Sequence, residues 1–290
     1  MIQRLCIVGV GLIGGSLAKD LRRLGLVREV VGCSRKRENL ERARELGIVD
    51  TYDVDPAKAV AGADMVVLAV PLGAMADVLG VMGPGLDDGA VLTDVGSAKT
   101  SVLDAARSAF GTVPGNFVPA HPIAGTEHSG VEAALDNLFE GRRVILTPVA
   151  ETLPPAVARV REMWQAVGAE VLEMDPAHHD EVLAATSHLP HMLAYTLVDM
   201  LGNMEERVEM FRYAAGGFRD FTRIASSDPQ MWHDICIANR DALVNALEHF
   251  QGDLGTALDA IRDGDGKTIK DLFTRAKALR DRYTGESDVD

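Results

Sequence analysis

A histidine, a serine and an arginine in this sequence have the chemistry of a site that moves a proton and binds an anion. His121 follows the strand-like residues 117–120, and Ser97 follows the strand-like residues 90–94. An unperturbed imidazole titrates near neutral pH, so a histidine at a strand end can act as a general base on a bound molecule. Arg223 follows a pair of glycines, and a guanidinium can hold a carboxylate through two parallel hydrogen bonds. Together these residues predict proton abstraction from a small acidic metabolite.

Each of these side chains also has an ordinary structural interpretation. Ser97 can cap the helix that follows it. An interdomain salt bridge is the alternative for the arginine, and it fits Arg219 at least as well as Arg223. Gly216 and Gly217 predict a loop that carries both arginines.

A glycine-rich turn near the N-terminus predicts a dinucleotide site. Gly9, Gly11 and Gly14 lie between the strand-like residues 4–9 and the helix-like residues 14–24, which is the context that a GxGxxG motif requires. Such a turn brings the pyrophosphate close to the free N–H groups of a helix N-terminus. The alternative is a turn that only packs a helix against a strand. The residues expected to contact the cofactor here are Gly9, Gly11, Leu12, Ile13, Gly14, Val70 and Pro71.

The end of the second strand, residues 29–33, bears on the choice of cofactor. NAD sites usually place a carboxylate there for the ribose 2′-hydroxyl, whereas this chain continues with Ser34, Arg35, Lys36 and Arg37. A hydroxyl and a planar guanidinium suit a 2′-phosphate. The sequence therefore favours NADP, with Ser34, Arg35 and Arg37 as contacts, and leaves NAD possible. The alternative is a solvated basic start of the following helix.

Apolar strand-like segments alternate with helical patterns over residues 1–174 and then stop. The strand-like segments are residues 4–9, 29–33, 65–70, 90–94, 117–120, 143–147 and 170–174, and the helical ones are residues 14–24, 37–46, 72–82, 99–109 and 154–167. This alternation predicts a Rossmann-like α/β domain with a doubly wound, mostly parallel sheet. Residues 175–290 show helical patterns alone, at 176–200, 203–213, 229–251, 254–263 and 267–283. We therefore expect an all-helical C-terminal domain.

Charge and composition argue against several classes of protein. The 290 residues carry a net charge of −14, and no basic stripe exists that would displace the counterions of a nucleic acid. No apolar run reaches the ~18 residues of a membrane span, and no export signal precedes the first strand. We therefore expect a cytoplasmic protein without a nucleic-acid or membrane partner. Cys6, Cys33 and Cys236 are expected to be reduced structural thiols.

Residues 175–191 contain four histidines, which raises the question of a metal site. Residues 178–180, two histidines and an aspartate, open a predicted helix, and His188 and His191 follow. Pro190 disturbs that helix, whereas a two-histidine metal site usually has its ligands at i and i+4 on one unbroken face. We therefore expect no metal, and we interpret His188 and His191 as hydrogen-bonding side chains of a polar cleft.

Five segments of the chain resemble the prephenate and arogenate dehydrogenases, also called cyclohexadienyl dehydrogenases, of tyrosine biosynthesis. The segments are residues 9–16 (GVGLIGGS), 94–99 (DVGSAK), 121–127 (HPIAGTE), 187–191 (SHLPH) and 217–232 (GFRDFTRIASSDPQMW). They occur in the order of the family. The last three are specific to it, whereas the first is shared by many dehydrogenases.

The resemblance implies a role for each matching residue. His121 matches the family's catalytic histidine, which takes the proton from the ring hydroxyl, and Ser97 matches the serine that hydrogen-bonds this histidine and the substrate. Arg223 matches the arginine that holds a substrate carboxylate, and His191 matches a histidine that contacts the substrate. The other matches around the substrate are Glu127 at the entrance, Thr126 beside it, Trp232 near the pocket, and Asp180, His188 and Asp220 as polar supports of the interdomain cleft.

The resemblance further implies oxidative decarboxylation of prephenate to 4-hydroxyphenylpyruvate, of arogenate to tyrosine, or of both, with hydride transfer to NAD or NADP. It implies a nucleotide-binding domain over residues 1–174 and a helical domain over residues 175–290 that binds substrate and forms a homodimer. Ser34 and Arg35 resemble the NADP-using members, whereas NAD-using members tend to have an aspartate at this strand end.

Two other functions stay open from the residues. The first is another Rossmann dehydrogenase of a small hydroxy or amino acid. Such enzymes commonly use a lysine of the helical domain as proton donor, and the absence of lysine from residues 176–215 counts against this function. The second is a non-catalytic nucleotide-binding regulator, which would need no base, serine and arginine together.

Overall fold

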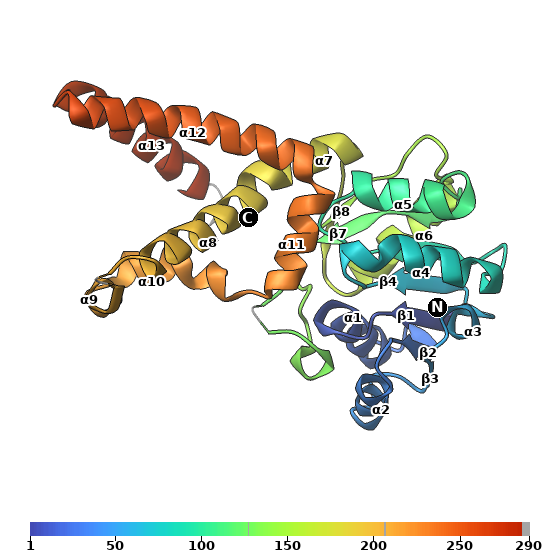
Figure 1. Cartoon of the computed structure of the whole chain (residues 1–290). Helices are drawn as coiled ribbons and strands as arrows, with labels where there is room; N and C mark the ends of the chain where they lie inside the picture. Colours follow the sequence, from blue (N-terminus) through green and yellow to red (C-terminus); the bar gives the residue numbers. More distant parts are fainter. Residues whose placement is uncertain (127, 206, 286–290) are drawn as a thin grey trace. The chain divides into compact units, whose positions relative to one another are not determined.

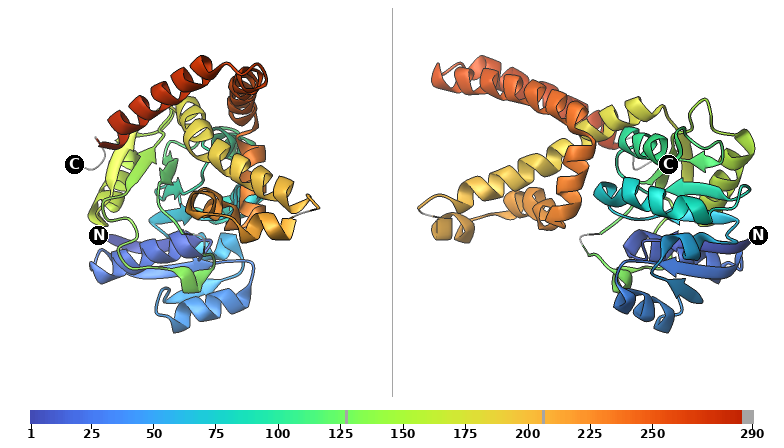
Figure 2. Two further views of the ribbon diagram at one scale, coloured as in Figure 1. Left: turned by 90° about the vertical axis from the view of Figure 1, so that its left-hand side faces the viewer. Right: turned by 45° about the vertical axis from the view of Figure 1, so that its right-hand side comes forward.

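The computed structural model describes residues 1–126, 128–205 and 207–285 (Figure 1). The chain divides into two compact units, Met1–Ala242 and Leu243–Asp290. Both sheets lie in the first unit, and in Figures 1 and 2 helices flank the strands on both faces.

The central element of the first unit is a six-stranded parallel sheet with the strand order β3-β2-β1-β4-β5-β6. Its strands are β1 (Ile2–Val8), β2 (Val27–Cys33), β3 (Thr51–Asp53), β4 (Met65–Leu68), β5 (Val91–Asp94) and β6 (Phe117–Val118). The strand order reverses beside β1, and in open α/β sheets ligands bind outside the carboxyl ends of the strands at such a point. The predicted Rossmann-like fold class is therefore confirmed, although the short strand β3 was not predicted.

The two faces of this sheet bury separate apolar cores because successive side chains of a strand point to opposite faces. Leu5 and Ile7 of β1 belong to one core, and Cys6 and Val8 belong to the other. The helices that pack into the first core are α1 (Leu12–Arg23), α2 (Arg37–Glu45) and α6 (Pro154–Ala166). Those that pack into the second core are α3 (Pro56–Val60), α4 (Met75–Met82) and α5 (Thr100–Phe110).

A second, three-stranded sheet has the order β7-β8-β9, with β7 antiparallel and β9 parallel to β8. Its strands are β7 (Ala120–Pro122), β8 (Arg143–Leu146) and β9 (Glu170–Glu173). The prediction of a single sheet through these segments is wrong, because the chain leaves the first sheet at Pro119. Proline has no N–H for a strand ladder, and the carbonyl of Pro119 accepts the N–H of Thr147 at 2.9 Å. His121 consequently lies within β7 and not at the end of a parallel strand.

The described residues after β9 contain helices and no strand, as predicted. The helices are α7 (Pro176–Leu183), α8 (Leu189–Gly202), α9 (Arg207–Arg212), α10 (Gly216–Thr222), α11 (Pro229–Ala238), α12 (Arg240–Arg262) and α13 (Gly266–Gly285). A π turn, η4 (Ala184–His188), lies between α7 and α8, and the short 3₁₀ turns are η1 (Leu72–Ala74), η2 (Gly83–Gly85), η3 (Val131–Ala133) and η5 (Arg223–Ser226). No helix in the described ranges is long and apolar enough to cross a membrane.

Four of the predictions for this helical part of the chain are wrong. The π turn η4 interrupts the expected helix over residues 176–200, since Pro190 provides no N–H to the carbonyl four residues earlier. The expected loop at Gly216 and Gly217 is helix α10, in which both glycines occupy the first turn, where N–H groups need no partner within the helix. The expected helix over residues 229–251 breaks at Asn239, whereas α12 runs on without the break expected near residue 252.

Candidate active site

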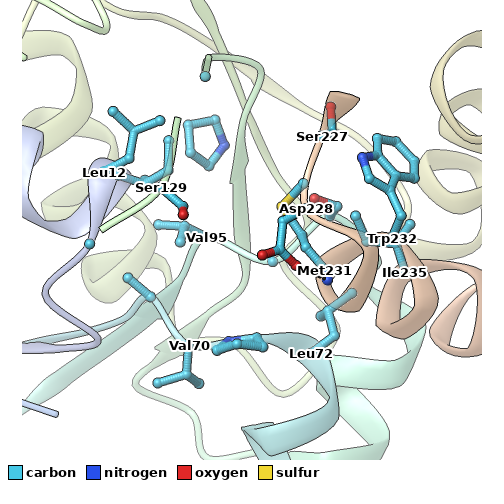
Figure 3. Close-up of a pocket in the computed structure, with 18 of the residues that line it drawn as sticks. Leu12, Val70, Leu72, Val95, Ser129, Ser227, Asp228, Met231, Trp232 and Ile235 are labelled. Carbon is cyan, nitrogen blue, oxygen red and sulfur yellow. Dashed lines mark hydrogen bonds between the residues drawn. The ribbon is translucent and has the colours of Figure 1, made fainter. Parts of the chain in front are cut away.

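A cavity of about 520 Å³ lies at the carboxyl end of the parallel sheet, beside the reversal of strand order (Figure 3). Residues 11–14 after β1, residues 69–72 after β4 and residues 95–97 after β5 line one side. The first turns of α11 line the other side, and Figure 3 shows their side chains, Trp232 among them, across from Leu12 and Val70. This is the position at which a doubly wound sheet binds its ligand.

Most of the site residues predicted from the sequence line this cavity. They are Gly11, Leu12, Ile13, Gly14, Val70, Pro71, Ser97, His121, Thr126, His188 and Trp232. The predicted residues outside its lining are Gly9, Ser34, Arg35, Arg37, Asp180, His191, Asp220 and Arg223. Glu127 lies outside the described residues.

The glycine-rich turn fits a dinucleotide pyrophosphate. Gly9 has a φ of +101°, and a Cβ there would lie 2.2 Å from the carbonyl oxygen of Ala69. Gly11, in contrast, has open space where a side chain would be, and as the N-cap of α1 it provides no side-chain hydrogen bond to that helix. The turn therefore leaves both room and unpaired helix N–H groups for an anion.

Charges of both signs surround the end of β2, where the adenosine ribose of a dinucleotide is held in this fold. Ser34 is half-buried and Arg35 is exposed, and neither forms a hydrogen bond or ion pair with another described residue. On the other side, Asp53 of β3 pairs in register with Cys33. Burial mainly, and then the charges of Asp53 and Asp55, raise the pKa of Cys33 to about 11. A free guanidinium and a carboxylate thus both stand near this strand end.

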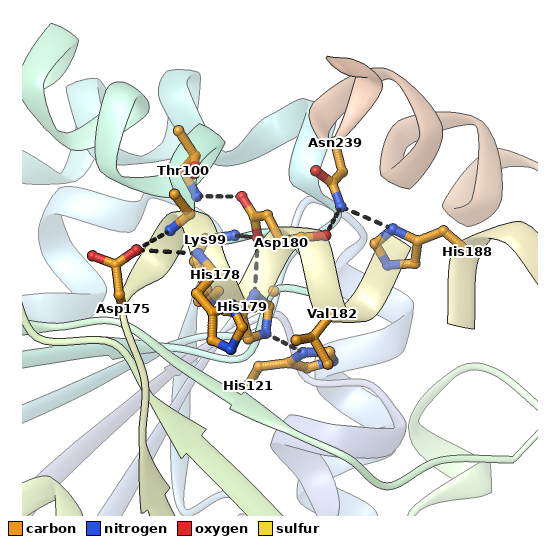
Figure 4. A network of polar contacts seen from close by, with 12 residues as sticks. Lys99, Thr100, His121, Asp175, His178, His179, Asp180, Val182, His188 and Asn239 are labelled. Carbon is orange, nitrogen blue, oxygen red and sulfur yellow. Dashed lines mark hydrogen bonds and ion pairs between the residues drawn. The ribbon is translucent and has the colours of Figure 1, made fainter. Parts of the chain in front are cut away.

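His121 belongs to a chain of three buried side chains (Figure 4). Its Nδ1 lies 2.9 Å from Nε2 of His179, and Nδ1 of His179 lies 2.8 Å from Oδ1 of Asp180. Asp180 also accepts the backbone N–H groups of Lys99 and Thr100 at 2.7 and 2.9 Å, and so caps the N-terminus of α5. Because Nδ1 of His121 is engaged, Nε2 is the ring nitrogen left for a molecule in the cavity. Ser97 lines the same cavity without a hydrogen bond to His121.

A fully buried ion pair holds the residue that precedes His121. Nζ of Lys99 lies 2.5 Å from Oδ2 of Asp94 and donates to the carbonyl oxygen of Ala120 at 2.6 Å. Oδ1 of Asp94 accepts the N–H of Ala120 at 3.1 Å. The pair therefore fixes both backbone groups of Ala120 and joins the start of β7 to the end of β5.

Burial controls the protonation states in this region. Burial is the main reason why the pKa of His121 lies well below its ordinary value, and His179 and Lys99 lower this pKa further. Burial also lowers the pKa of His188 to about 4. For Asp180, burial would raise the pKa, but the hydrogen bonds from His179 and from two backbone N–H groups outweigh it and leave the pKa below the ordinary value. At neutral pH both His121 and His188 are uncharged, and Asp180 is a carboxylate.

His188 offers a hydrogen-bond donor to the cavity. Its Nδ1 lies 3.1 Å from the amide nitrogen of Asn239, which also donates to the carbonyl oxygen of Asp180 at 2.8 Å. Since an amide nitrogen only donates, Nδ1 accepts and the proton of the neutral ring lies on Nε2. That atom is buried and has no partner in the described parts of the chain. An oxygen of a bound molecule would satisfy it.

Trp232 links the cavity to two predicted residues outside its lining. The ring of His191 stacks on Trp232 with centroids 3.6 Å apart. Burial is the main reason for the lowered pKa of His191, the carbonyl of Ser187 opposes this effect, and the charge of Arg223 adds to it. Arg223 therefore stands near this aromatic stack, and its exposed guanidinium forms no ion pair with any residue that the structure describes. Asp220, on α10, is exposed as well.

Sequence reasoning missed His179, Asn239, Asp94 and Lys99 as parts of this site. His179 was considered only as a metal ligand, but it is hydrogen-bonded on both ring nitrogens. Among the described residues, no group of three or more His, Cys, Asp or Glu side chains is arranged to hold a metal ion. A sequence signal did exist for Lys99, because a lysine beside an apolar segment needs a buried partner if it lies in the core.

Comparison with known proteins agrees with this geometry. A family model described as the nucleotide-binding domain of prephenate dehydrogenase matches residues 17–173, and one described as the dimerization domain matches residues 175–275. A cyclohexadienyl dehydrogenase of Zymomonas mobilis is 37% identical over 100% of this chain and 99% of its own length.

Two solved structures share the whole architecture. Prephenate dehydrogenase of Aquifex aeolicus, in complex with hydroxyphenyl propionate and NAD+, has a TM-score of 0.89 and 38% identity, and the match covers 98% of this chain and 99% of that chain. Arogenate dehydrogenase of Synechocystis has a TM-score of 0.81 and 30% identity, and the match covers 97% and 100%. The resemblance inferred from the motifs is thereby confirmed, and the chain belongs to the prephenate dehydrogenase family.

Proposed function

We propose that this protein is an oxidoreductase that oxidatively decarboxylates prephenate, arogenate or both, with a nicotinamide dinucleotide as hydride acceptor. The observation that carries the proposal is the cavity that the glycine-rich turn and the base His121 share. Relatives named as prephenate, cyclohexadienyl and arogenate dehydrogenases support the same reaction. The product is 4-hydroxyphenylpyruvate from prephenate and tyrosine from arogenate.

His121 acts as the base of the oxidation. Its neutral Nε2 takes the proton of the ring hydroxyl, while the hydride on the same carbon leaves for the dinucleotide. When bound, the nicotinamide supplies the acceptor for this hydride. Residues 11–14 hold the dinucleotide, and Ser97, on the same cavity wall, binds the hydroxyl oxygen.

Loss of carbon dioxide follows from the structure of the oxidised ring. The dienone carries its carboxylate on the quaternary carbon opposite the new carbonyl, so the electrons of the breaking C–C bond flow into that oxygen and the ring becomes aromatic. The protonated His121 faces the same oxygen and returns the proton to the phenolate. The Nε2–H of His188 provides a neutral donor in the cavity for a substrate oxygen.

A turnover assay tests this function against the two alternatives. The purified protein is supplied with prephenate or arogenate and with NAD or NADP, and reduced cofactor and carbon dioxide are measured. We expect one carbon dioxide for each reduced cofactor with at least one substrate. Cofactor binding without turnover would indicate a nucleotide-binding regulator, and turnover with a simple hydroxy acid alone would indicate a different dehydrogenase.

NADP is the cofactor that we propose as the better of the two. Arg35 can bind a 2′-phosphate, because it has no competing ion pair in the described structure. Ser34 stands where NAD sites usually have a carboxylate, which would repel this phosphate. The carboxylate of Asp53 opposes this preference, since it lies beside the end of β2. A charge-assisted hydrogen bond contributes about 1.5–3 kcal/mol, so one such bond would favour NADP by roughly 10- to 150-fold.

Replacing Ser34 by Asp together with Arg35 by Ala should shift the preference towards NAD and leave the rate at saturating NAD nearly unchanged. The measurement is kcat/KM for both cofactors. Arg28→Ala is the matched control, because Arg28 is an exposed arginine near the amino end of the same strand. A higher kcat/KM with NAD for the unmodified protein would show that residues 34–37 are only a solvated helix start.

Arg223→Ala should raise the KM for prephenate about 10–100-fold and change kcat less. A carboxylate contact that is made equally in the ground and transition states affects KM first, and a hydrogen bond to a charged group contributes about 1.5–3 kcal/mol. Arg219→Ala is the matched control, since Arg219 is exposed on α10 and is likewise free of ion pairs with described residues. A rise in KM for the control alone would move the role to Arg219.

The division of labour along the chain is part of the proposal. Residues 1–174 bind the dinucleotide, and residues 175–290 bind substrate and form a homodimer. The ranges of the two family models, one of them described as a dimerization domain, support this division. Exposed apolar side chains on α12, namely Leu254, Leu258 and Ile261, support a contact with a second copy.

A further inference from the structure

The hydrogen bonds behind His121 determine where its proton lies. His121, His179 and Asp180 are 8%, 0% and 4% exposed, so water does not replace the contacts among them. The charged or titratable groups that face them are Lys99, which pairs with Asp94, and His188, which is neutral at pH 7. After burial, His179, Lys99 and His188 are the groups that lower the pKa of His121.

Along the hydrogen bonds from Asp180 through His179 to His121, the donor of each bond determines the donor of the next. Asp180, as a carboxylate, only accepts hydrogen bonds, so Nδ1 of His179 carries a proton. When the His179 ring carries this one proton, its Nε2 has a lone pair, and the atom 2.9 Å away, Nδ1 of His121, is the donor. The opposite arrangement, with Nε2 of His179 as the donor, would need a second proton and thus a positive charge on this fully buried ring.

We propose that His179, held by Asp180, is a positioning residue that fixes His121 in the Nδ1–H tautomer and thereby presents a basic Nε2 to the cavity. The inference rests on the proposed role of His121 as base, because it explains how a buried neutral imidazole has its lone pair on the correct side. Without His179, the proton of His121 can move to Nε2, where it would block proton abstraction.

Two replacements of His179 separate this role from simple packing. His179→Leu fills the space but offers no hydrogen-bond acceptor. We expect kcat to fall about 10–100-fold, with unchanged KM for prephenate and cofactor. This loss is smaller than the roughly 10²–10⁴-fold loss expected when the general base itself is removed. His179→Gln has a carbonyl oxygen and an amide nitrogen at a spacing close to that of the two ring nitrogens, so it should restore most of kcat. His178→Leu, at the exposed neighbouring residue, is the control and should change nothing.

Nitrogen NMR of protein labelled with ¹⁵N-histidine tests the tautomer without substrate. The signals of His121 are those that disappear in His121→Asn. We expect a protonated Nδ1 and an unprotonated Nε2 in the unmodified protein, and a protonated Nε2 in His179→Leu. This readout is independent of turnover, so it separates a failure of the inference from a failure of the proposed reaction.

Several outcomes would overturn the inference. A protonated Nε2 of His121 in the unmodified protein would directly contradict the proposed tautomer. This measurement does not depend on the folding of the His179 variants. Full activity in His179→Leu, or activity in His179→Gln as low as in His179→Leu, would show that an acceptor at this position does not set the rate.

Discussion

Replacing His121 by asparagine should lower kcat by roughly 10²–10⁴-fold, the usual contribution of a positioned general base. Asparagine keeps a polar side chain that can bond to His179, but it cannot take a proton from the substrate hydroxyl. Binding of the dinucleotide should be unchanged, because residues 11–14 and not His121 form the glycine-rich turn. Steady-state rates at saturating substrate, together with a cofactor titration, measure both quantities.

His128→Asn is the matched control for this prediction. His128 also lines the cavity, but it is exposed, and we expect its replacement to change kcat less than His121→Asn does. Near-normal turnover in His121→Asn would remove His121 from the mechanism.

The pH profile of the unmodified protein checks the same residue. Burial lowers the pKa of His121 well below 6.5, so the base stays unprotonated as the pH falls through 6.5. Activity should therefore be lost only when the pH passes below the lowered pKa, at which His121 becomes protonated. An acidic limb of kcat/KM at or above pH 6.5 would mean that the titrating base is not this buried histidine.

The parts of the site that could be predicted from sequence are those with short-range signals. The glycine-rich turn is recognisable within six residues. A Cβ at Gly9 would lie 2.2 Å from the carbonyl oxygen of Ala69, and one at Gly14 would lie 2.6 Å from that of Gly9, whereas Gly11 leaves open space. Strand and helix periodicity likewise predicted the six-stranded parallel sheet, except for its short strand β3, but not the separate three-stranded sheet. The role of His121 came from its sequence context and from the resemblance to a family, and the structure adds its place in the cavity lining.

The parts that could not be predicted depend on contacts between distant residues. His179 meets His121 across 58 positions, and Asn239 meets His188 across 51. The switch from β6 to β7 at Pro119 likewise depends on pairing with β8, which no local pattern reveals. Helix α10 was missed because two glycines normally favour a loop, and only the position of Gly216 and Gly217 in the first turn makes them compatible with a helix.

The second large effect should come from the buried Asp94–Lys99 pair. Both side chains are fully buried, and removal of one partner of such a pair costs about 3–5 kcal/mol because an uncompensated charge stays in the interior. We expect Lys99→Met to lower the free energy of unfolding by about this amount, measured by urea denaturation. Arg107→Ala, which breaks the exposed pair of Arg107 and Asp104, is the control and should cost no more than about 0.5 kcal/mol.

A double variant separates the buried charge from the packing. Asp94→Asn combined with Lys99→Met removes both charges and keeps an oxygen that can accept the N–H of Ala120, so it should be more stable than Lys99→Met alone. We expect a lowered kcat in both Lys99→Met and the double variant, because both lack the hydrogen bond from Nζ of Lys99 to the carbonyl of Ala120, directly before the base. A loss below about 1 kcal/mol for Lys99→Met would show that burial of the charge is not costly here. A double variant less stable than the single one would show that the amide cannot take the place of the carboxylate towards the backbone of Ala120.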